Sequence, residues 1–346
     1  MAFFGSKRRK SVSEQVVVVT GASSGVGRAI ARAFGAAGAK VGLIARGVDG
    51  LEACAREIVE AGGQALVLPL DVSDAAAVER AADAVVARFG RIDTWVNDAM
   101  VSVFSRALDM TPEEYERVTK VNYLGFVHGT LAALRRMRDQ GDGGGIIQIG
   151  SALVYRSIPL QSAYCASKAA IRGFTDSLRS ELLHDRIPVH LSMLQLPAVN
   201  TPQFDVVRSR LPNHPQPVPP IYQPEVIARA CLHVAEHPVR ELWIATSAIK
   251  AIVGQKLVPG FADRYLARNG FSSQQTDEPV APGRKDNVDA PLPGDRGAHG
   301  DFDARSKGRS LELWLRTHPW ITAGAAAAFA AAGALGARAR SPLRSP

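Results

Sequence analysis

The sequence predicts an α/β domain in which a doubly wound parallel sheet of about seven strands carries helices on both faces. Between residues 15 and 245, short runs rich in β-branched residues alternate with alanine-rich stretches, which is the pattern of β–α–β units. A glycine-rich turn directly follows the first run. The chain has 346 residues, of which 46% are hydrophobic and 21% charged, so it is long enough for one such domain with tails.

The apolar runs are predicted to be the strands of this sheet, and the stretches between them the crossover helices. In chain order, the predicted strands are Val16–Thr20, Lys40–Ala45, Ala65–Pro69, Thr94–Asn97, Gly145–Gly150, Val189–Gln195 and Glu241–Ala245.

The remaining chain divides into tails and a linker. Residues 1–13 form a basic N-terminal tail ahead of a catalytic domain that we place at residues 14–270. Residues 271–309 are rich in Pro, Gly, Asp and Ser and have almost no large apolar side chains. Because such a segment cannot offset its ordering entropy by burial, we expect a disordered linker there.

Residues 310–346 are predicted to form a C-terminal helix. Its stretch Trp320–Ala337 is uncharged and is followed by Arg338 and Arg340. The length is close to the roughly 20 residues of a membrane span, and small residues recur every four positions, but alanine and glycine drive insertion only weakly. A membrane anchor and a peripheral or low-complexity helix therefore both stay open.

Charge and cysteine content narrow the classes of function. The formal net charge is +8, but much of the excess lies at the two ends of the chain, which disfavours a nucleic-acid partner. The cysteines, Cys54, Cys165 and Cys231, are too few and scattered for a disulfide framework or a zinc site. The apolar run after the basic N-terminus is too short for a signal peptide. We expect a cytoplasmic protein, or a membrane-associated one if the C-terminal helix is an anchor.

The turn TGASSGVG, residues 20–27, predicts a nucleotide-binding loop. Glycine lets the backbone turn sharply and approach a pyrophosphate, while the helix that follows offers free N–H groups and the positive end of its dipole. Such a turn alone could be purely structural, but its place after the first strand favours the nucleotide.

The end of the second strand indicates which nicotinamide cofactor binds. NAD-binding folds usually carry an acidic residue there for the ribose 2′-hydroxyl, whereas this chain has Ala45 followed by Arg46. An arginine can accommodate a 2′-phosphate, so we expect NADP(H), with NAD(H) as the alternative. The structural interpretation is an Arg46 that merely faces solvent.

Ser151, Tyr164 and Lys168 are the candidates for catalysis. Tyr164 and Lys168 lie four residues apart on one predicted helix, so the ammonium can sit beside the phenol and lower its pKa from about 10. The phenol can then act as general acid in carbonyl reduction or general base in alcohol oxidation. Ser151 follows a strand and can hydrogen-bond the substrate oxygen.

In order and spacing, these motifs resemble the short-chain dehydrogenase/reductase family. The match spans roughly residues 14–250 and rests on TGASSGVG, Asp71, Asn97 with Ala99, Asn122 in KVNYLG, Ser151 and YCASK. The resemblance implies a Rossmann-like sheet and a homodimer or homotetramer. It assigns catalysis to Asn122, Ser151, Tyr164 and Lys168, with Lys168 also binding the cofactor ribose and Asn122 holding a water near Lys168.

The resemblance also implies the cofactor site. Asp71 would accept the adenine amine, although an aspartate before Ser73 is equally a loop or cap residue. The cofactor-binding residues are Gly21, Ser23, Ser24, Gly25, Val26, Gly27, Arg46, Asp71, Val72, Asn97, Ala99, Tyr164, Lys168, Pro197, Val199 and Thr201. Two departures alter the local geometry, because Met100 and Ala198 stand where the family has glycines.

The proline-rich stretch after Thr201 predicts the substrate loop, since its prolines restrict the backbone to extended and turn conformations. Tyr155 and Phe204 are the pocket candidates, and they favour an apolar or bulky substrate. The same residues would also suit a loop that packs against its own domain. His233 and His237 match a zinc-protease pattern, but Pro238 ends that helix, so we interpret them as a solvated helix end and expect no metal.

The leading hypothesis is an NADP(H)-dependent oxidoreductase that interconverts an alcohol and a carbonyl of a small molecule by hydride transfer. The alternative is a cofactor-binding sensor or membrane-tethered scaffold with little turnover. It is motivated by the altered segments at Met100 and Ala198 and by the long tail. The intact pair Tyr164 and Lys168 argues against it, because a protein without turnover has no chemical need for that pair.

Overall fold

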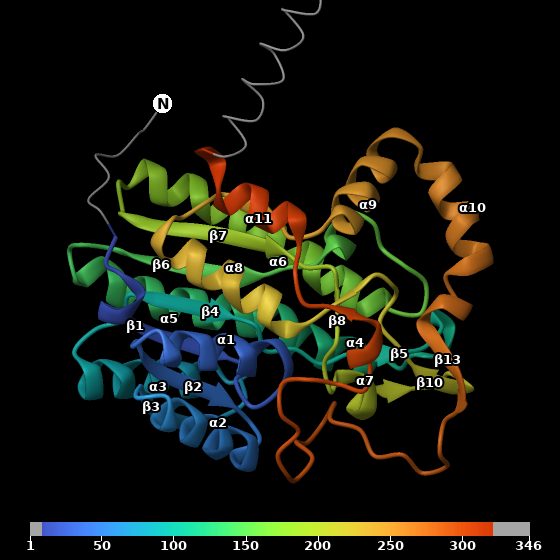
Figure 1. Cartoon of the computed structure of the whole chain (residues 1–346), viewed down its shortest axis with the longest axis horizontal. Coiled ribbons are helices and arrows are strands. Elements are labelled where there is room, and N and C mark those ends of the chain that lie inside the picture. Colours follow the sequence, from blue (N-terminus) through green and yellow to red (C-terminus); the bar gives the residue numbers. More distant parts are fainter. Residues whose placement is uncertain (1–8, 321–346) are drawn as a thin grey trace, which may run out of the picture.

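The computed structural model describes residues 9–320, and its centre is a parallel sheet in the order β12-β7-β6-β4-β1-β2-β3 (Figure 1). The strands are β1 (Val16–Thr20), β2 (Lys40–Ala45), β3 (Gln64–Pro69), β4 (Thr94–Asn97), β6 (Gly144–Ile149), β7 (Val189–Gln195) and β12 (Glu241–Trp243). The predicted doubly wound α/β fold is confirmed. The largest difference in strand bounds is at β12, which ends at Trp243 instead of Ala245.

The strand β1 shows why these residues form a sheet that is covered on both faces. Side chains alternate along a strand, so Val17 and Val19 enter one hydrophobic core while Val16 and Val18 enter the other. All four valines are buried. A parallel sheet with helices on both faces needs this continuous apolar run, in contrast to the alternation of a half-exposed strand.

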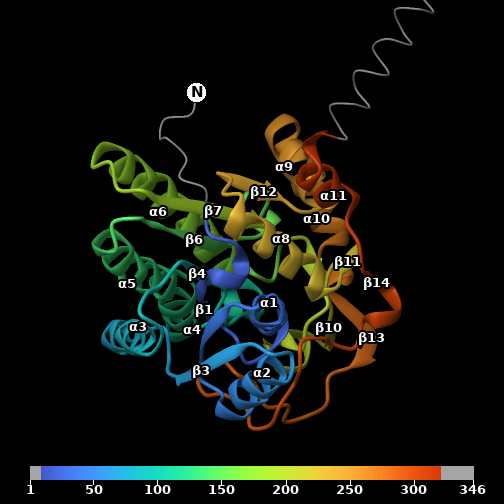
Figure 2. The same ribbon diagram turned by 60° about the vertical axis from the view of Figure 1, so that its left-hand side comes forward.

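Helices cover both faces of the sheet (Figures 1 and 2). The helices α1 (Gly25–Ala36), α2 (Val48–Glu60) and α8 (Pro224–Glu236) pack over one core. The helices α3 (Ala75–Phe89), α5 (Gly125–Asp139) and α6 (Ser162–His184) pack over the other. Because the strands are parallel, their carboxyl ends all lie at one edge of the sheet, between the two helix layers. This is the edge at which α/β folds of this kind bind ligands.

Shorter elements complete the fold. Their helices are α4 (Pro112–Thr119), α7 (Gln203–Val206), α9 (Thr246–Leu257), α10 (Pro259–Asn269) and α11 (Leu311–Thr317). Their strands are β5 (Val103–Phe104), β8 (Ala198–Val199), β9 (Arg208–Ser209), β10 (Asn213–Pro215), β11 (Ile221–Tyr222), β13 (Gln275–Pro279) and β14 (Ser306–Lys307). In Figure 1, α9 and α10 form a hairpin that projects from the domain.

Residues 271–309 differ from the expected disordered linker. They include β13, which pairs with β10, and β14, which pairs with β11. The chain after β13 runs past α7 and α2 and returns toward α11 (Figures 1 and 2). Three apolar side chains of this segment, Val288, Ala298 and Phe302, are buried. Arginines of the domain bind its carboxylates and carbonyls, and the composition of the segment alone gives no sign of these contacts.

The two ends of the described chain are also packed. Within the predicted basic tail, Arg9 donates to the carbonyl of Asp93 at 2.9 Å and Lys10 pairs with its carboxylate at 3.2 Å. At the other end, Leu313 of α11 is buried. Within residues 9–320, no helix combines the length and the hydropathy that a membrane span requires. The stretch after Trp320, on which the anchor interpretation rests, lies outside the described residues.

Candidate active site

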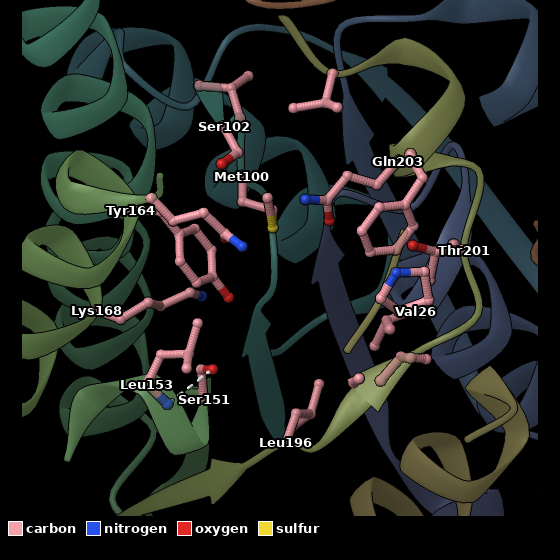
Figure 3. Close-up of a pocket in the computed structure, with 18 of the residues that line it drawn as sticks. Val26, Met100, Ser102, Ser151, Leu153, Tyr164, Lys168, Leu196, Thr201 and Gln203 are labelled. Carbon is pink, nitrogen blue, oxygen red and sulfur yellow. Dashed lines mark hydrogen bonds between the residues drawn. The ribbon is translucent and has the colours of Figure 1, made fainter. Parts of the chain in front are cut away.

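A cavity of about 760 Å³ lies at the carboxyl edge of the sheet. It extends from the glycine-rich turn at Ser23 and Ser24, past Arg46 at the end of β2, to Tyr164 on α6. Its volume falls within the range of about 300–1,000 Å³ that is usual for small-molecule and cofactor sites. Figure 3 shows Tyr164 and Lys168 on one side of this cavity and Thr201 and Gln203 on the other.

The glycine-rich turn has the backbone that a dinucleotide needs. Gly21 has φ 77° and Gly25 has φ 58°, a left-handed region that favours glycine. At Gly27, an added Cβ would lie 2.3 Å from the carbonyl oxygen of Gly21, so α1 can start this close to the turn only with glycine there. Gly21 and Gly25 line the cavity, whereas Gly27 packs behind it. These features fit a nicotinamide dinucleotide bound across the N-terminus of α1.

Arginines gather at the end of the cavity beside β2. Arg46 lines the cavity, and its guanidinium also donates to the carbonyls of Val288 at 3.2 Å and Asp289 at 3.1 Å. Arg117 pairs with Asp71 at 2.5 Å and donates to the carbonyl of Val288 at 3.0 Å. Burial, and to a lesser extent the positive charge of Arg117, lowers the pKa of Arg46. Asp71 and Val72 both line the cavity.

Ser151, Tyr164 and Lys168 meet at the other end of the cavity (Figure 3). Ser151 follows β6, and its backbone N–H donates to Gln195 at 2.9 Å while its hydroxyl caps the next turn by accepting from Leu153 at 3.1 Å. The hydroxyl of Ser151 is close enough to the phenol of Tyr164 to lower the pKa of that phenol. Lys168 is buried, and its Nζ donates to the carbonyl of Ile149 at 2.7 Å.

The pKa of Tyr164 differs from the sequence-based expectation. Burial raises the pKa of this phenol above its usual value, and the nearby hydroxyl of Ser151 opposes that rise. Lys168 Nζ lies 5.7 Å from the centroid of the Tyr164 ring, and its direct hydrogen bond goes to Ile149. In this structure, burial therefore outweighs the lowering that we expected from the ammonium.

Asp98 is a charged cavity residue that the sequence reasoning did not single out. It lines the cavity, and its carboxylate lies close to Gly27, whose backbone N–H works to lower the pKa of Asp98. Burial raises the pKa of Asp98, and the ammonium of Lys168 opposes that rise. Burial lowers the pKa of Lys168, and Asp98 in turn opposes that change. The visible signal was the aspartate in Asn97–Asp98–Ala99, where the family pattern has a second asparagine.

Asn122 does not line the cavity but lies behind Val101 and Ser167. It is buried in the turn between α4 and α5, where its amide donates to the carbonyl of Val101 at 2.9 Å and to the hydroxyl of Ser167 at 3.3 Å. Its carbonyl oxygen accepts from the backbone N–H of Val101 at 2.8 Å. Asn122 thus fixes the chain next to Lys168 on one side and the cavity wall at Val101 on the other.

Two other predicted site residues point elsewhere. The side chain of Asn97 is fully buried in the core, where it accepts from Trp95 and donates to Thr130 and Gln148. Tyr155 donates to Glu241 at 2.6 Å and packs edge-on against Trp243, so it faces the β12 edge of the sheet. Its placement in the substrate pocket was wrong, because the turn after Ser151 rotates this ring away from the cavity.

The substrate end of the cavity is largely apolar. Phe204, a predicted pocket residue, lines the cavity together with Val206 and Val207. The hairpin of α9 and α10 adds a wall that sequence reasoning missed, because it follows the last strand without any motif. The residues that this hairpin contributes are Ser247, Gly254, Gln255, Val258, Phe261, Ala262, Tyr265 and Leu266. Other predicted cavity residues that do line it are Val26, Ala99, Pro197, Val199 and Thr201.

The histidine pair of the zinc-protease pattern ends a helix. His233 and His237 stack with their ring centroids 4.8 Å apart at the end of α8. Among the described residues, no cluster of three or more His, Cys, Asp or Glu side chains could hold a metal ion.

Comparison with known proteins identifies the family. A model of the short chain dehydrogenase family matches residues 15–211. The uncharacterized oxidoreductase YxnA of Bacillus subtilis (strain 168) is 36% identical over 274 residues, which are 79% of this chain and 77% of that protein. The human dehydrogenase/reductase SDR family member 7 is 40% identical over 182 residues, which are 51% of this chain and 53% of that protein.

Solved structures show the same fold around an NADP-type ligand. An alcohol dehydrogenase from the archaeon Thermococcus sibiricus, complexed with 5-hydroxy-NADP, is 32% identical with a TM-score of 0.57 and covers 66% of this chain and 95% of its own. A metagenomic short-chain oxidoreductase in complex with NADP is 32% identical with a TM-score of 0.57 and covers 68% of this chain and 98% of its own. With its Rossmann-like sheet and its matched residues, this chain belongs to the short-chain dehydrogenase/reductase family of oxidoreductases.

Proposed function

We propose that the protein is an NADP(H)-dependent oxidoreductase that interconverts an alcohol and a carbonyl on an apolar or bulky small molecule. The observation that carries this proposal is the convergence of Ser151, Tyr164 and Lys168 in one cavity that begins at the glycine-rich turn. A nicotinamide bound in this cavity supplies a hydride in one direction and accepts it in the other. The protein must then hold the substrate oxygen and move one proton.

The proposed roles follow from the contacts of each side chain. Tyr164 gives its phenolic proton to the carbonyl oxygen during reduction and takes it back during oxidation. Ser151, which lines the same cavity as Tyr164, holds the substrate oxygen beside that phenol. The ammonium of Lys168 stabilises the phenolate that remains after proton transfer, and Asn122 positions Lys168 through Ser167.

The preference for NADP(H) rests on Arg46. It lines the cavity at the end of β2, where the chain has Ala45 in place of the acidic residue that would repel a 2′-phosphate. The complexes of the two similar structures with NADP-type ligands support the same choice. Lys168 is proposed to bind the nicotinamide ribose, and Asp71 the adenine amine.

An apolar or bulky substrate is supported by the wall that Phe204, Val207 and Phe261 form beyond Tyr164. We also propose a homodimer or homotetramer, as the family resemblance implies. We further propose a cytoplasmic location, with a membrane contact through residues 320–337 as the alternative.

Replacing Tyr164 by phenylalanine tests the proposed mechanism. Tyr164→Phe removes the transferable proton but keeps the ring, so turnover of a carbonyl substrate with NADPH is expected to fall by about 10²- to 10⁴-fold. NADPH binding, measured by fluorescence titration, is expected to stay within about threefold of wild type. Tyr222→Phe is the matched control, because Tyr222 is not on the cavity wall, and it should leave turnover unchanged. Full turnover in Tyr164→Phe would contradict the mechanism.

A further inference from the structure

The segment after β13 follows the walls of the cofactor site. We call residues 284–303 the cover segment. Five of its residues line the cavity: Asn287, Pro291, Leu292, Gly294 and Arg296. No motif of the family resemblance includes them, because that resemblance ends near residue 250.

The cover segment is fixed at the substrate loop on both of its ends. At its start, Arg284 donates to the carbonyls of Phe204 and Asp205, and Asp286 forms a two-pronged pair with Arg208 at 2.9 and 3.1 Å. At its end, the backbone N–H of Phe302 donates to Asn200 at 3.1 Å, and the amide of Asn200 donates to Asp303 at 2.8 Å. Both ends therefore lie beside the loop that follows β7.

Between these ends, the cover segment crosses the nucleotide side of the cavity. The carbonyls of Asn287, Val288 and Asp289 accept from the guanidinium of Arg46. Farther along, the backbone N–H of Gly294 donates to Asp49 on α2 at 2.6 Å. These contacts hold the segment against the end of β2 and the start of α2.

The glycine-rich turn is the next point of contact. Asp295 pairs with Arg28 on α1 at 3.0 Å, where the Arg28 side chain is 1% exposed and the Asp295 side chain 42%. The backbone N–H of Gly25 donates to the carbonyl of Gly297 at 3.0 Å. Gly300 packs so closely that an added Cβ would lie 2.4 Å from the carbonyl oxygen of Thr201.

Room for a ligand remains beneath the segment. The cavity of about 760 Å³ is lined by residues of the cover segment and also by Ser24, Asp71 and Val72. Arg296 lines this space next to Gly297, and among the described residues its guanidinium makes no direct ion pair or hydrogen bond, although its charge acts on the nearby carboxylate of Asp205. A free guanidinium beside the N-terminus of α1 is well placed for a pyrophosphate.

We propose that the cover segment encloses the adenosine and pyrophosphate half of a bound nicotinamide dinucleotide, with Arg296 on the pyrophosphate, so that the cofactor leaves only when this segment moves away. The inference rests on the proposed function and adds a binding element to the same site. It also ties cofactor release to the substrate loop, because both ends of the cover segment are fixed there.

Loosening the cover segment tests the enclosure. In Asp286→Asn/Asp295→Asn, Arg208 keeps Glu114 and Asp289, and Arg28 keeps Glu57, so no buried arginine loses all its partners. The rate of NADPH release, measured by stopped-flow displacement, is expected to rise at least about tenfold, and the affinity to weaken with it. Asp142→Asn, which breaks the two-pronged pair with Arg91 far from the cavity, is the matched control and should release NADPH like wild type.

The possible results distinguish a failure of the proposed enclosure from a failure of the proposed function. Unchanged release, or tighter binding in the double variant, would overturn the enclosure, because tighter binding means that the segment obstructs the site. Wild-type protein that binds neither NADPH nor NADH would instead overturn the proposed function, and the enclosure with it. If the double variant fails to fold, the enclosure is tested by measuring amide hydrogen exchange of the wild-type protein with and without NADPH. NADPH is expected to slow exchange in residues 286–300, and unchanged exchange with NADPH bound overturns the proposal.

Arg296 has a test of its own. Arg296→Gln is expected to weaken NADPH and NADH by the same factor, about tenfold, because both cofactors carry the pyrophosphate. Arg309→Gln removes the same charge from an exposed position that is not on the cavity wall and should bind both cofactors like wild type. Unchanged affinity in Arg296→Gln would overturn its assignment.

Discussion

At the scale of single residues, Asp98 makes the electrostatics of this site unusual. A carboxylate and an ammonium share a buried region, and each opposes the effect of burial on the other. Both charges are held close to the proposed acid/base Tyr164, whose pKa the carboxylate also raises. The proton state of Asp98 and Lys168 therefore belongs to the pair, and titration of one changes the other.

Asp98→Asn is expected to shift the pH profile. The Asp98 carboxylate raises the pKa values of Lys168 and Tyr164, so its removal lowers both. The alkaline limb of kcat/KM should then move to lower pH, because the ammonium is lost earlier as the pH rises through the pKa of Lys168, which is about 8 in this structure. The control is Asp109→Asn, an exposed position. An alkaline limb that stays in place or moves to higher pH would contradict this account.

Arg46→Gln is expected to change which cofactor is preferred. Loss of the guanidinium removes a charge-assisted contact with a 2′-phosphate, so NADPH affinity should fall about 10- to 100-fold more than NADH affinity. Titration of both cofactors against the variant measures the ratio. Arg296→Gln serves as the comparison, since it is expected to lower both affinities together. An unchanged ratio in Arg46→Gln would remove the basis for NADP(H) preference.

The sequence predicted which residues lie near the site, but it did not predict where each of their side chains points. The spacing of Tyr164 and Lys168 placed them on one helix face, because α-helix geometry is regular. Tyr155 lies in a short 3₁₀ turn region after Ser151, where no such periodicity holds, and its ring turns to Glu241 and Trp243. The pKa of Tyr164 likewise depends on burial, which spacing alone does not report.

At the scale of secondary structure, Asn97 joins three elements. Its side chain accepts from Trp95 on β4 and donates to Thr130 on α5 and Gln148 on β6. These partners are themselves buried, so each depends on Asn97 for a hydrogen bond in the core. The residue that the family pattern suggested for the cofactor therefore stabilises the strand ends that carry the site.

Asn97→Ala is expected to lower the free energy of unfolding by about 2–4 kcal/mol, because it leaves buried polar groups of Trp95 and Gln148 without a partner. Chemical denaturation measures the change. Asn269→Ala, which loses one exposed hydrogen bond, should stay within about 0.5 kcal/mol of wild type. A variant at Asn97 with wild-type stability but lost NADPH affinity would show that Asn97 acts at the cofactor instead.

Elements with strong periodicity were predictable, and irregular ones were not. From the valines of β1 and the alternation of strand-like and helix-like stretches, the ends of every strand of the sheet were predicted to within two residues. The hairpin of α9 and α10 carries no nucleotide or catalytic motif, so its contribution to the substrate end appears only when Val258 and Phe261 are placed against the cavity.

At the scale of the whole molecule, the cover segment brings the C-terminal part of the chain back to the first β–α–β unit. Its composition predicts disorder because it lacks apolar side chains. It folds because arginines on the domain, Arg28, Arg46 and Arg208 among them, supply its partners. Composition describes a segment in isolation, whereas these contacts join residues far apart in the sequence.

The measurement that tests the central claim most directly is a fluorescence titration of wild-type protein with NADPH and with NADH, followed by addition of ketones, aldehydes and quinones. The account predicts that NADPH binds more tightly than NADH and is oxidised when a suitable apolar carbonyl is added. Binding without oxidation across the panel would favour the cofactor-binding sensor over the enzyme. Failure to bind either cofactor would contradict the account, because the cavity between Gly25 and Tyr164 would then serve another ligand.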